Sequence, residues 1–157
     1  MSMIQDEELV RIFSERTLIN LEYIEQKCHA GEQVYDATQL INSLLGLIVF
    51  PKERDFMRIP EIPLDDLEGW PHVEKTGTCS NLRDFCRRMR NAVAHCNILL
   101  LGSELIEGVK FQNKNKNGNV TWEHDFNIDE VKKIACMLHK TLNAKSFSQR
   151  NIINPSP

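Results

Sequence analysis

Apolar residues recur every three or four positions in four separate stretches of this chain, and this spacing restricts the possible folds more than any other feature. In the first stretch, residues 6–29, the recurring positions are Val10, Phe13, Thr17, Leu21, Ile24 and Cys28. Because an α-helix has about 3.6 residues per turn, it would gather these positions on one face. The other stretches predict helices over about residues 32–50 and 80–97, and from about residue 127 onward. We therefore expect a mainly α fold.

Capping residues indicate where three of these helices begin or end. Pro51 lacks a backbone N–H and stops the second helix. Thr78 or Ser80 is expected to cap the third helix, because a side-chain oxygen there accepts a hydrogen bond from the first turn. Asn127 and Glu130 have the spacing of a capping box, which places the start of the fourth helix at this point.

A long segment, residues 51–77, separates the second helix from the third. It contains four of the six prolines of the chain and the acidic residues Glu53, Asp55, Glu61, Asp65, Asp66 and Glu68. A connection of this length inside a domain is usually functional or packed over a surface. Two interpretations stay open: a solvated acidic loop, or a flap that borders or shields the third helix.

Residues 104–126 predict a β-hairpin between the third and fourth helices, with Asn117 and Gly118 as the central residues of a type I′ turn. On one face this register pairs Val109 with Phe126, Phe111 with His124, Asn113 with Trp122 and Asn115 with Val120, and on the other it pairs Lys110 with Asp125. The expected architecture is a single four-helix, bundle-like domain over residues 1–150 with this hairpin inserted, followed by a flexible tail at residues 151–157.

Composition limits the class of function. The formal net charge of -3 argues against a general nucleic-acid coat, so any affinity for nucleic acid must come from a local patch. The chain has no apolar run of about 18 residues and its start does not resemble a signal peptide, so we expect a cytoplasmic protein with no membrane partner. The five cysteines are scattered and form no C-x-x-C pair, which fits reduced thiols better than disulfides or zinc ligands.

The third helix carries the residues whose chemistry stands out. Three polar residues lie within six positions near its end: Arg90, Asn91 and His95. Three arginines precede them: Arg83, Arg87 and Arg88. An arginine donates two parallel hydrogen bonds to phosphate oxygens, and a histidine transfers protons near neutral pH. RNA supplies its own nucleophile, the 2′-hydroxyl, so a base and a cation would cleave it without a metal ion or other cofactor.

Each residue of this stretch therefore has a predicted role. His95 would handle the proton of the 2′-hydroxyl, Arg90 would stabilise the transition state, and Asn91 would position either group. The preceding arginines would hold the RNA backbone, so binding should weaken with salt. The ordinary structural interpretation is a solvated or salt-bridged Arg90 and a His95 that only favours the negative end of the helix dipole.

Helix geometry restricts how Arg90 and His95 could act together. Five positions along an ideal helix separate two side chains by about 140°, whereas Asn91 and His95, four apart, share a face. Either the long Arg90 side chain wraps round the helix and His95 lies at a frayed end, or two copies of the helix meet at a two-fold axis. We favour the dimer, because residues 44–50 are apolar on nearly all sides and would also suit a partner subunit.

The stretch Arg90–His95, late in the third helix of a small helical domain, resembles the signature of the HEPN superfamily. That signature is an Arg and a His separated by four residues, with a polar residue, often Asn, directly after the Arg. Residues 40–51, Leu-Ile-Asn-Ser-Leu-Leu-Gly-Leu-Ile-Val-Phe-Pro, are similar to small plasmid- and phage-defence-type members of the group. The resemblance covers about residues 9–142.

This resemblance implies a helical fold, a homodimer with paired motif helices and, in many members, metal-independent endoribonuclease activity. By motif match, Arg90 and His95 are the catalytic pair and Asn91 is the auxiliary polar residue. HEPN toxins controlled by a nucleotidyltransferase antitoxin carry Tyr two residues after the His, where this chain has Asn97, so that switch is not expected. Other HEPN domains only bind nucleic acid or protein partners.

Three other groups of residues were candidates for chemistry. Glu123, His124 and Asp125 resemble part of a metal site, but His124 points to the opposite face of the predicted hairpin from its two neighbours. Cys96 lies beside His95, and we expect it to be a buried apolar residue rather than a nucleophile. Residues 113–117 could touch phosphate, although a polar hairpin tip is the simpler interpretation.

The leading hypothesis is a homodimeric, metal-independent endoribonuclease in a defence or toxin–antitoxin setting, with RNA as its substrate and an antitoxin or regulator protein as a further partner. A second hypothesis is a non-catalytic HEPN module that binds RNA or a protein. A third is a structural dimer in which Arg90 and His95 serve only the interface.

Overall fold

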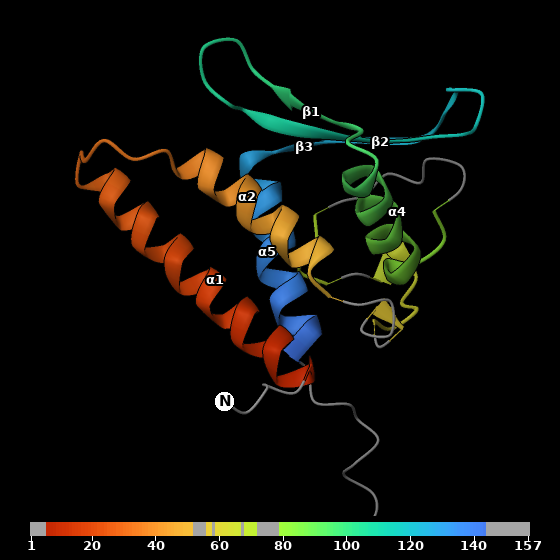
Figure 1. The fold of residues 1–157 in the computed structure, drawn as a ribbon, viewed down its shortest axis with the longest axis horizontal. Helices are drawn as coiled ribbons and strands as arrows, with labels where there is room; N and C mark the ends of the chain where they lie inside the picture. Colours follow the sequence, from red (N-terminus) through yellow and green to blue (C-terminus); the bar gives the residue numbers. More distant parts are fainter. Residues whose placement is uncertain (1–5, 52–55, 58, 67, 72–78, 144–157) are drawn as a thin grey trace, which may run out of the picture.

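The computed structural model of the chain describes residues 6–51, 56–57, 59–66, 68–71 and 79–143 (Figure 1). Its elements are α1 (Asp6–His29), α2 (Asp36–Val49), the 3-10 helix η1 (Leu64–Asp66), α4 (Leu82–Ala94), β1 (Ile98–Leu101), β2 (Gly108–Lys114), β3 (Val120–Asn127) and α5 (Ile128–Asn143). The fold is mainly α, as the helical periodicity predicts. The predicted tail at residues 151–157 lies outside the described residues.

The helices lie on one side of a small antiparallel sheet with strand order β1-β2-β3 (Figure 1). Helix α2 packs against α1, α4 and α5, while α4 and α5 also contact strand β2. None of the described helices is long and apolar enough to cross a membrane.

Aromatic side chains fill the space between α4 and the sheet. The fully buried ring of Phe85 meets Trp70, Trp122 and Phe126 edge to face, with centroids 5.9 to 6.2 Å apart. Burying a side chain of this size stabilises a fold by roughly 1.5–3 kcal/mol. The face of α4 that carries Phe85 is therefore held against the sheet, and this leaves its polar flanks beside the rim of the sheet.

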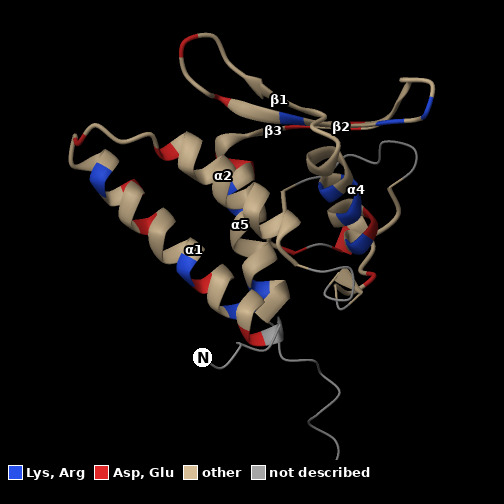
Figure 2. Cartoon of the chain, viewed as in Figure 1, with Lys and Arg blue, Asp and Glu red and all other residues tan. Residues whose placement is uncertain are grey.

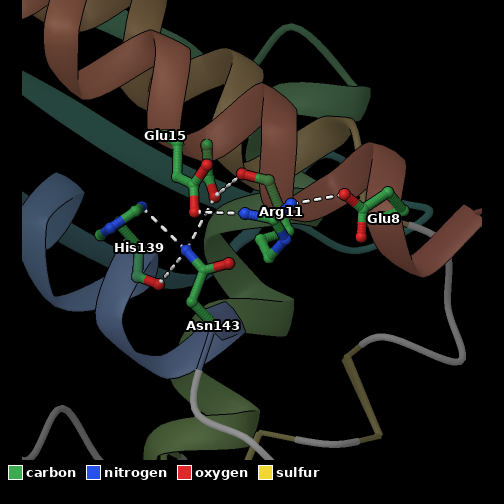
Figure 3. Close-up of polar contacts among 6 residues, drawn as sticks. Glu8, Arg11, Glu15, His139 and Asn143 are labelled. Atoms are coloured by element: carbon green, nitrogen blue, oxygen red, sulfur yellow. Dashed lines mark hydrogen bonds and ion pairs between the residues drawn. The ribbon is translucent and has the colours of Figure 1, made fainter.

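Polar contacts join the first and last described helices. In Figure 3, Arg11 lies between Glu8 and Glu15 on α1, and Asn143, the last residue of α5, lies beside His139. The Asn143 amide also donates a 2.9 Å hydrogen bond to the hydroxyl of Ser14, which is fully buried on α1. This contact ties the end of α5 to the middle of α1.

Helix α1 has the predicted bounds, but α2 begins at Asp36 rather than near residue 32. The intervening residues complete the end of α1: the backbone N–H of Gly31 bonds to Cys28 and that of Glu32 bonds to Lys27. At the other end of α2, Leu44, Leu47 and Ile48 are buried against the rest of the chain. Part of the apolar surface of residues 44–50, which was expected to suit a partner subunit, is therefore covered by the same chain.

The cap of α4 differs from the prediction by one residue. Asn81 is the N-cap, and its side-chain oxygen accepts a 2.9 Å hydrogen bond from the backbone N–H of Asp84. The predicted cap Ser80 stands one position too early, and Thr78 lies outside the described residues. The capping box of α5 is confirmed, because Asn127 and Glu130 exchange two side-chain to backbone bonds of 2.9 Å.

The predicted hairpin is present with its predicted register from Val109–Phe126 to Asn113–Trp122. The tip is different: Lys114, not Asn115, pairs with Val120, and Thr121 is left without a partner as a β-bulge. Asn115 closes the loop with Asn119, and Gly118 has a φ of 82°. A three-residue turn with a left-handed glycine therefore replaces the predicted two-residue turn.

Strand β1 was not predicted. It pairs antiparallel with β2, Ile98 opposite Phe111, and converts the hairpin into a three-stranded sheet. Its four residues are all apolar and show no alternation, so nothing local distinguishes them from the end of a helix.

Candidate functional site

The end of helix α4 presents His95 to solvent. His95 is the C-cap residue, and the next residue, Cys96, has a φ of 54°. The backbone N–H of Asn97 bonds to Ala92 at 2.8 Å, and that of Cys96 bonds to Val93 at 3.0 Å. These two bonds form a Schellman motif, which usually has glycine where this chain has Cys96. The motif turns the chain away from the helix axis immediately after His95.

Cys96 is exposed, which contradicts the prediction that it is a buried apolar residue. The prediction assumed that the helix continues to about residue 97, whereas it ends at Ala94. Once the chain leaves helical geometry, position 96 no longer follows the buried stripe of Phe85 and Met89.

An open hollow of about 290 Å³ lies between α4 and the tip of the β2–β3 hairpin. Helix α4 contributes one wall, made of Asp84, Arg87, Arg88, Asn91 and His95. The hairpin contributes the other, made of Asn113, Lys114 and Thr121. Basic segments of α4 and of the hairpin tip lie on the same side of the molecule (Figure 2). We call this feature the α4–hairpin hollow.

Cationic side chains outnumber acidic ones in the α4–hairpin hollow. Arg87, Arg88 and Lys114 face a single carboxylate, Asp84. The Asp84 carboxylate accepts a 3.0 Å hydrogen bond from Nε of Arg88, one turn further along α4. The hollow thus concentrates positive charge in a chain whose formal net charge is -3, which is the local patch that any nucleic-acid affinity would need.

Asn113 and Thr121 hold the hairpin wall in place. The amide of Asn113 donates a 3.1 Å hydrogen bond to the backbone carbonyl of Arg88 and so joins β2 to α4. The hydroxyl of Thr121 donates to the carbonyl of Asn113 across the bulge at 3.2 Å. A bulge redirects side chains at the end of a sheet, and here Thr121 lines the hollow.

Arg90 does not line the hollow. Its guanidinium carbon lies 4.8 Å from the centre of the Phe56 ring, on a different flank of α4 from His95. This separation agrees with the angle of about 140° between positions five apart on a helix. Within one chain, the structure therefore brings Asn91 together with His95 but not Arg90.

Arg83 contacts the segment before α4 rather than the hollow. Its guanidinium donates to the backbone carbonyls of Ile59 at 2.7 Å and Met57 at 3.0 Å, and to the carboxylate of Glu61. Arg87 lies between the two regions, because it lines the hollow and also approaches the sulfur of Met57 at 3.9 Å. Of the arginines predicted to hold nucleic acid, Arg87 and Arg88 are the two at the hollow.

Part of the acidic connector packs beside α4. The backbone N–H of Leu82 bonds to the carbonyl of Ile62 at 2.9 Å, and Pro63 forms a β-bridge with Asn81. Glu53 and Asp55 lie outside the described residues. Among the described ones, Glu61 is engaged with Arg83. The described part of the connector therefore borders α4, and that the connector shields this helix stays a prediction.

Glu123 and Asp125 approach Lys110 on one face of the hairpin, with separations of 3.9 and 3.2 Å. The ring of His124 lies on the other face, 4.4 Å from the ring of Phe126. Within the described ranges, no three His, Cys, Asp or Glu residues are grouped so that they could hold a metal ion.

The sequence did not indicate that the hairpin tip lines the same hollow as His95. The sequence shows that residues 113–117 are rich in Asn and Lys, which marks them as polar. Their position beside α4 depends on the contact between Asn113 and Arg88, which are 25 positions apart in the chain. No local pattern encodes that contact.

A family model described as HEPN pEK499 p136 matches residues 1–149 of the chain. The match spans nearly the whole sequence, and the chain belongs to this HEPN family. No curated protein and no solved structure matches it. The resemblance carried by Arg90–His95 and by residues 40–51 is thus confirmed for the family and for the helical fold.

Proposed function

We propose that this HEPN protein is a metal-independent endoribonuclease whose α4–hairpin hollow binds the RNA backbone at the cleaved bond. The observation that carries the proposal is that His95 and Asn91 line a hollow together with Arg87, Arg88 and Lys114. A proton-transferring imidazole thus lies among cations that attract phosphate.

The proposed reaction uses the 2′-hydroxyl of the RNA. His95 removes its proton, the 2′-oxygen attacks the adjacent phosphorus, and the bond from phosphorus to the 5′-oxygen breaks. The departing oxygen takes a proton from solvent, and the products are a 2′,3′-cyclic phosphate and a 5′-hydroxyl. Asn91, one turn before His95, orients the imidazole or donates to a phosphate oxygen.

Arg90 enters this reaction through a second subunit. Because its guanidinium lies over Phe56, away from the hollow of its own chain, we propose that two motif helices meet at a two-fold axis. Arg90 of one chain would then stabilise the phosphorane-like transition state beside His95 of the other. Removing such a donor lowers kcat by roughly 100- to 1000-fold.

The biological setting that we propose is defence or a toxin–antitoxin pair, with an antitoxin or regulator as a protein partner. The support is the similarity of residues 40–51 to small plasmid- and phage-defence-type HEPN proteins. A second candidate function, RNA or protein binding without catalysis, is favoured by the separation of Arg90 from His95 within one chain.

The deciding experiment is to incubate the protein with structured RNA in EDTA and to repeat it with a substrate that carries 2′-deoxy sugars. The variant is His95→Ala, and the matched control is His29→Ala, since His29 is also exposed at the end of a helix. We expect cleavage that requires both His95 and the 2′-hydroxyl. Intact RNA with salt-sensitive binding would support the binding module and contradict the enzyme.

A further inference from the structure

We propose that Lys114, on the β2–β3 hairpin, binds a second backbone phosphate of the RNA, next to the phosphate that is cleaved. The inference rests on the proposed function, because it takes the α4–hairpin hollow as the place where RNA lies. The hairpin would then contact the RNA directly, and the RNA strand would be bound from both walls of the hollow.

Lys114 differs from its neighbours on the hairpin in what surrounds it. It is exposed, it lines the hollow opposite α4, and within the described part of the chain its side-chain ammonium group makes no hydrogen bond or ion pair. Lys110, four residues earlier on β2, instead lies 3.2 Å from the carboxylate of Asp125 on the outer face. Lys116 is exposed at the tip and does not line the hollow.

The backbone that carries Lys114 is held on both sides. The residue before it, Asn113, is bonded to the carbonyl of Arg88 on α4. The residue after it, Asn115, accepts bonds of 3.0 Å from the backbone N–H groups of Asn117 and Asn119, which close the tip. The backbone at Lys114 is therefore anchored to α4 through Asn113, while the long lysine side chain can adopt several conformations.

The two walls of the hollow offer different kinds of phosphate contact. On the α4 wall, the guanidinium of Arg88 supplies directional donors that suit the phosphate where the reaction occurs, beside His95, which takes the proton of the 2′-hydroxyl. A lysine acts as a compact point charge that tolerates a range of positions, which suits a phosphate that is held but does not react. A strand that crosses the hollow from α4 to the hairpin would meet both walls, and successive phosphates would then contact His95 and Lys114.

The test measures RNA affinity as a function of salt. A single-stranded RNA with 2′-O-methyl sugars, which cannot be cleaved by 2′-hydroxyl attack, is titrated with the wild type, Lys114→Gln and Lys116→Gln between about 50 and 200 mM salt. Loss of one phosphate contact makes the negative slope of log K against log salt shallower by about 0.7 for single strands. We expect this loss for Lys114→Gln, little change for Lys116→Gln, and a wild-type slope for Lys114→Arg.

The variant Asn113→Ala tests whether Asn113 acts on RNA binding by positioning Lys114. If Asn113 acts by holding Lys114 beside α4, its substitution weakens RNA binding in the wild type but has little further effect in the Lys114→Gln background. A purely structural role of Asn113 would weaken binding equally in both backgrounds. Circular dichroism of each variant verifies that the fold is retained.

Equal slopes for Lys114→Gln and Lys116→Gln overturn the inference and leave the endoribonuclease proposal standing. If the wild type cleaves RNA through His95 yet Lys114→Gln binds as tightly as the wild type, the hairpin does not hold the substrate. If the wild type shows no salt-dependent RNA binding, the proposed function and the inference both fail.

Discussion

The guanidinium carbon of Arg90 lies 4.8 Å from the centre of the Phe56 ring, so the arginine of the HEPN signature is held by a buried aromatic residue from the connector. A cation over a ring gains about 0.5–2 kcal/mol, more when water is excluded. Helix geometry places Arg90 on a flank of α4 that does not line the hollow. The Phe56 contact stabilises the guanidinium there, and it comes from a residue that has no part in the HEPN signature.

This contact can be measured with a double-mutant cycle. Phe56→Leu keeps an apolar side chain but removes the ring, and Arg90→Met removes the cation. We expect Phe56→Leu to lower the free energy of unfolding by about 1–3 kcal/mol. About 0.5–2 kcal/mol of that loss should disappear in the Arg90→Met background, as followed by urea denaturation. Purely additive losses would show that the two side chains do not interact.

Arg83 should contribute to stability. Its guanidinium donates to the carbonyls of Met57 and Ile59 and to the carboxylate of Glu61. Arg83→Met leaves these acceptors without their donor, and we expect the free energy of unfolding to fall by about 2–3 kcal/mol. Arg87→Met, a control on the more exposed neighbouring turn, should cost less than about 1 kcal/mol. Similar losses for both variants in urea denaturation would contradict this role.

The N-cap of α4 can be identified by comparing two adjacent positions. Asn81→Ala removes the 2.9 Å hydrogen bond to the N–H of Asp84, and we expect it to destabilise the protein by about 1 kcal/mol. Ser80→Ala should change the free energy of unfolding by less than about 0.5 kcal/mol, since Ser80 is exposed and one residue before the cap. Thermal unfolding of both variants compares them directly, and a larger effect of Ser80→Ala would restore the prediction made from the sequence.

Cys96 occupies a backbone conformation that glycine adopts more readily. Its φ of 54° lies in the left-handed region, which disfavours residues with a Cβ by about 1–2 kcal/mol. We expect Cys96→Gly to raise the melting temperature or leave it unchanged. Cys96→Val, with a branched Cβ, should lower it. Equal melting temperatures for the two variants, measured by calorimetry, would contradict a left-handed residue at this position.

Stability should decline at alkaline pH because of buried thiols. Burial, and then the charge of Asp84, raise the pKa of Cys79 from 9.0 to about 11, and burial raises the pKa of Cys86 further. A group with a raised pKa in the folded state contributes its stability below the unfolded value, and that contribution is lost as the pH rises. For Cys79 the loss spans about pH 9 to 11.

The measurement is the free energy of unfolding at pH 8, 9.5 and 10.5 for the wild type and Cys79→Ala. The variant loses some stability at every pH because a buried side chain is truncated. Its decline between pH 8 and 10.5 should nevertheless be shallower than that of the wild type. Parallel declines would show that Cys79 does not titrate differently in the folded and unfolded states.

Features that depend on contacts one turn apart could be predicted from the sequence. The bounds of α1 and the capping box at Asn127 and Glu130 are examples, as is the shared face of Asn91 and His95. The hairpin register was correct as far as Asn113 and Trp122, because alternation along two strands admits only one pairing that buries the apolar face.

The errors occur where two alternatives have nearly equal local energy. Ser80 and Asn81 are both good caps, and only the start of α4 distinguishes them. The tip of the hairpin could close with two residues or three, and the bulge at Thr121 selects the longer loop. Strand β1 forms because β2 offers an open edge, which is a property of the assembled sheet.

Helical periodicity predicted a mainly α fold with an arginine-rich third helix, and the stretch Arg90–His95 together with residues 40–51 carried the resemblance to the HEPN family that the family model confirms. What the side chains of the candidate site contact was decided by packing between distant segments. Arg90 meets Phe56 from the connector on a flank of α4 away from the hollow, and the bond from Asn113 to Arg88 ties the hairpin that carries Lys114 to α4. The periodicity of one helix specifies which face a residue occupies. Which residues that face contacts depends on packing between segments that are far apart in the chain, and the pattern within one segment does not reveal that packing.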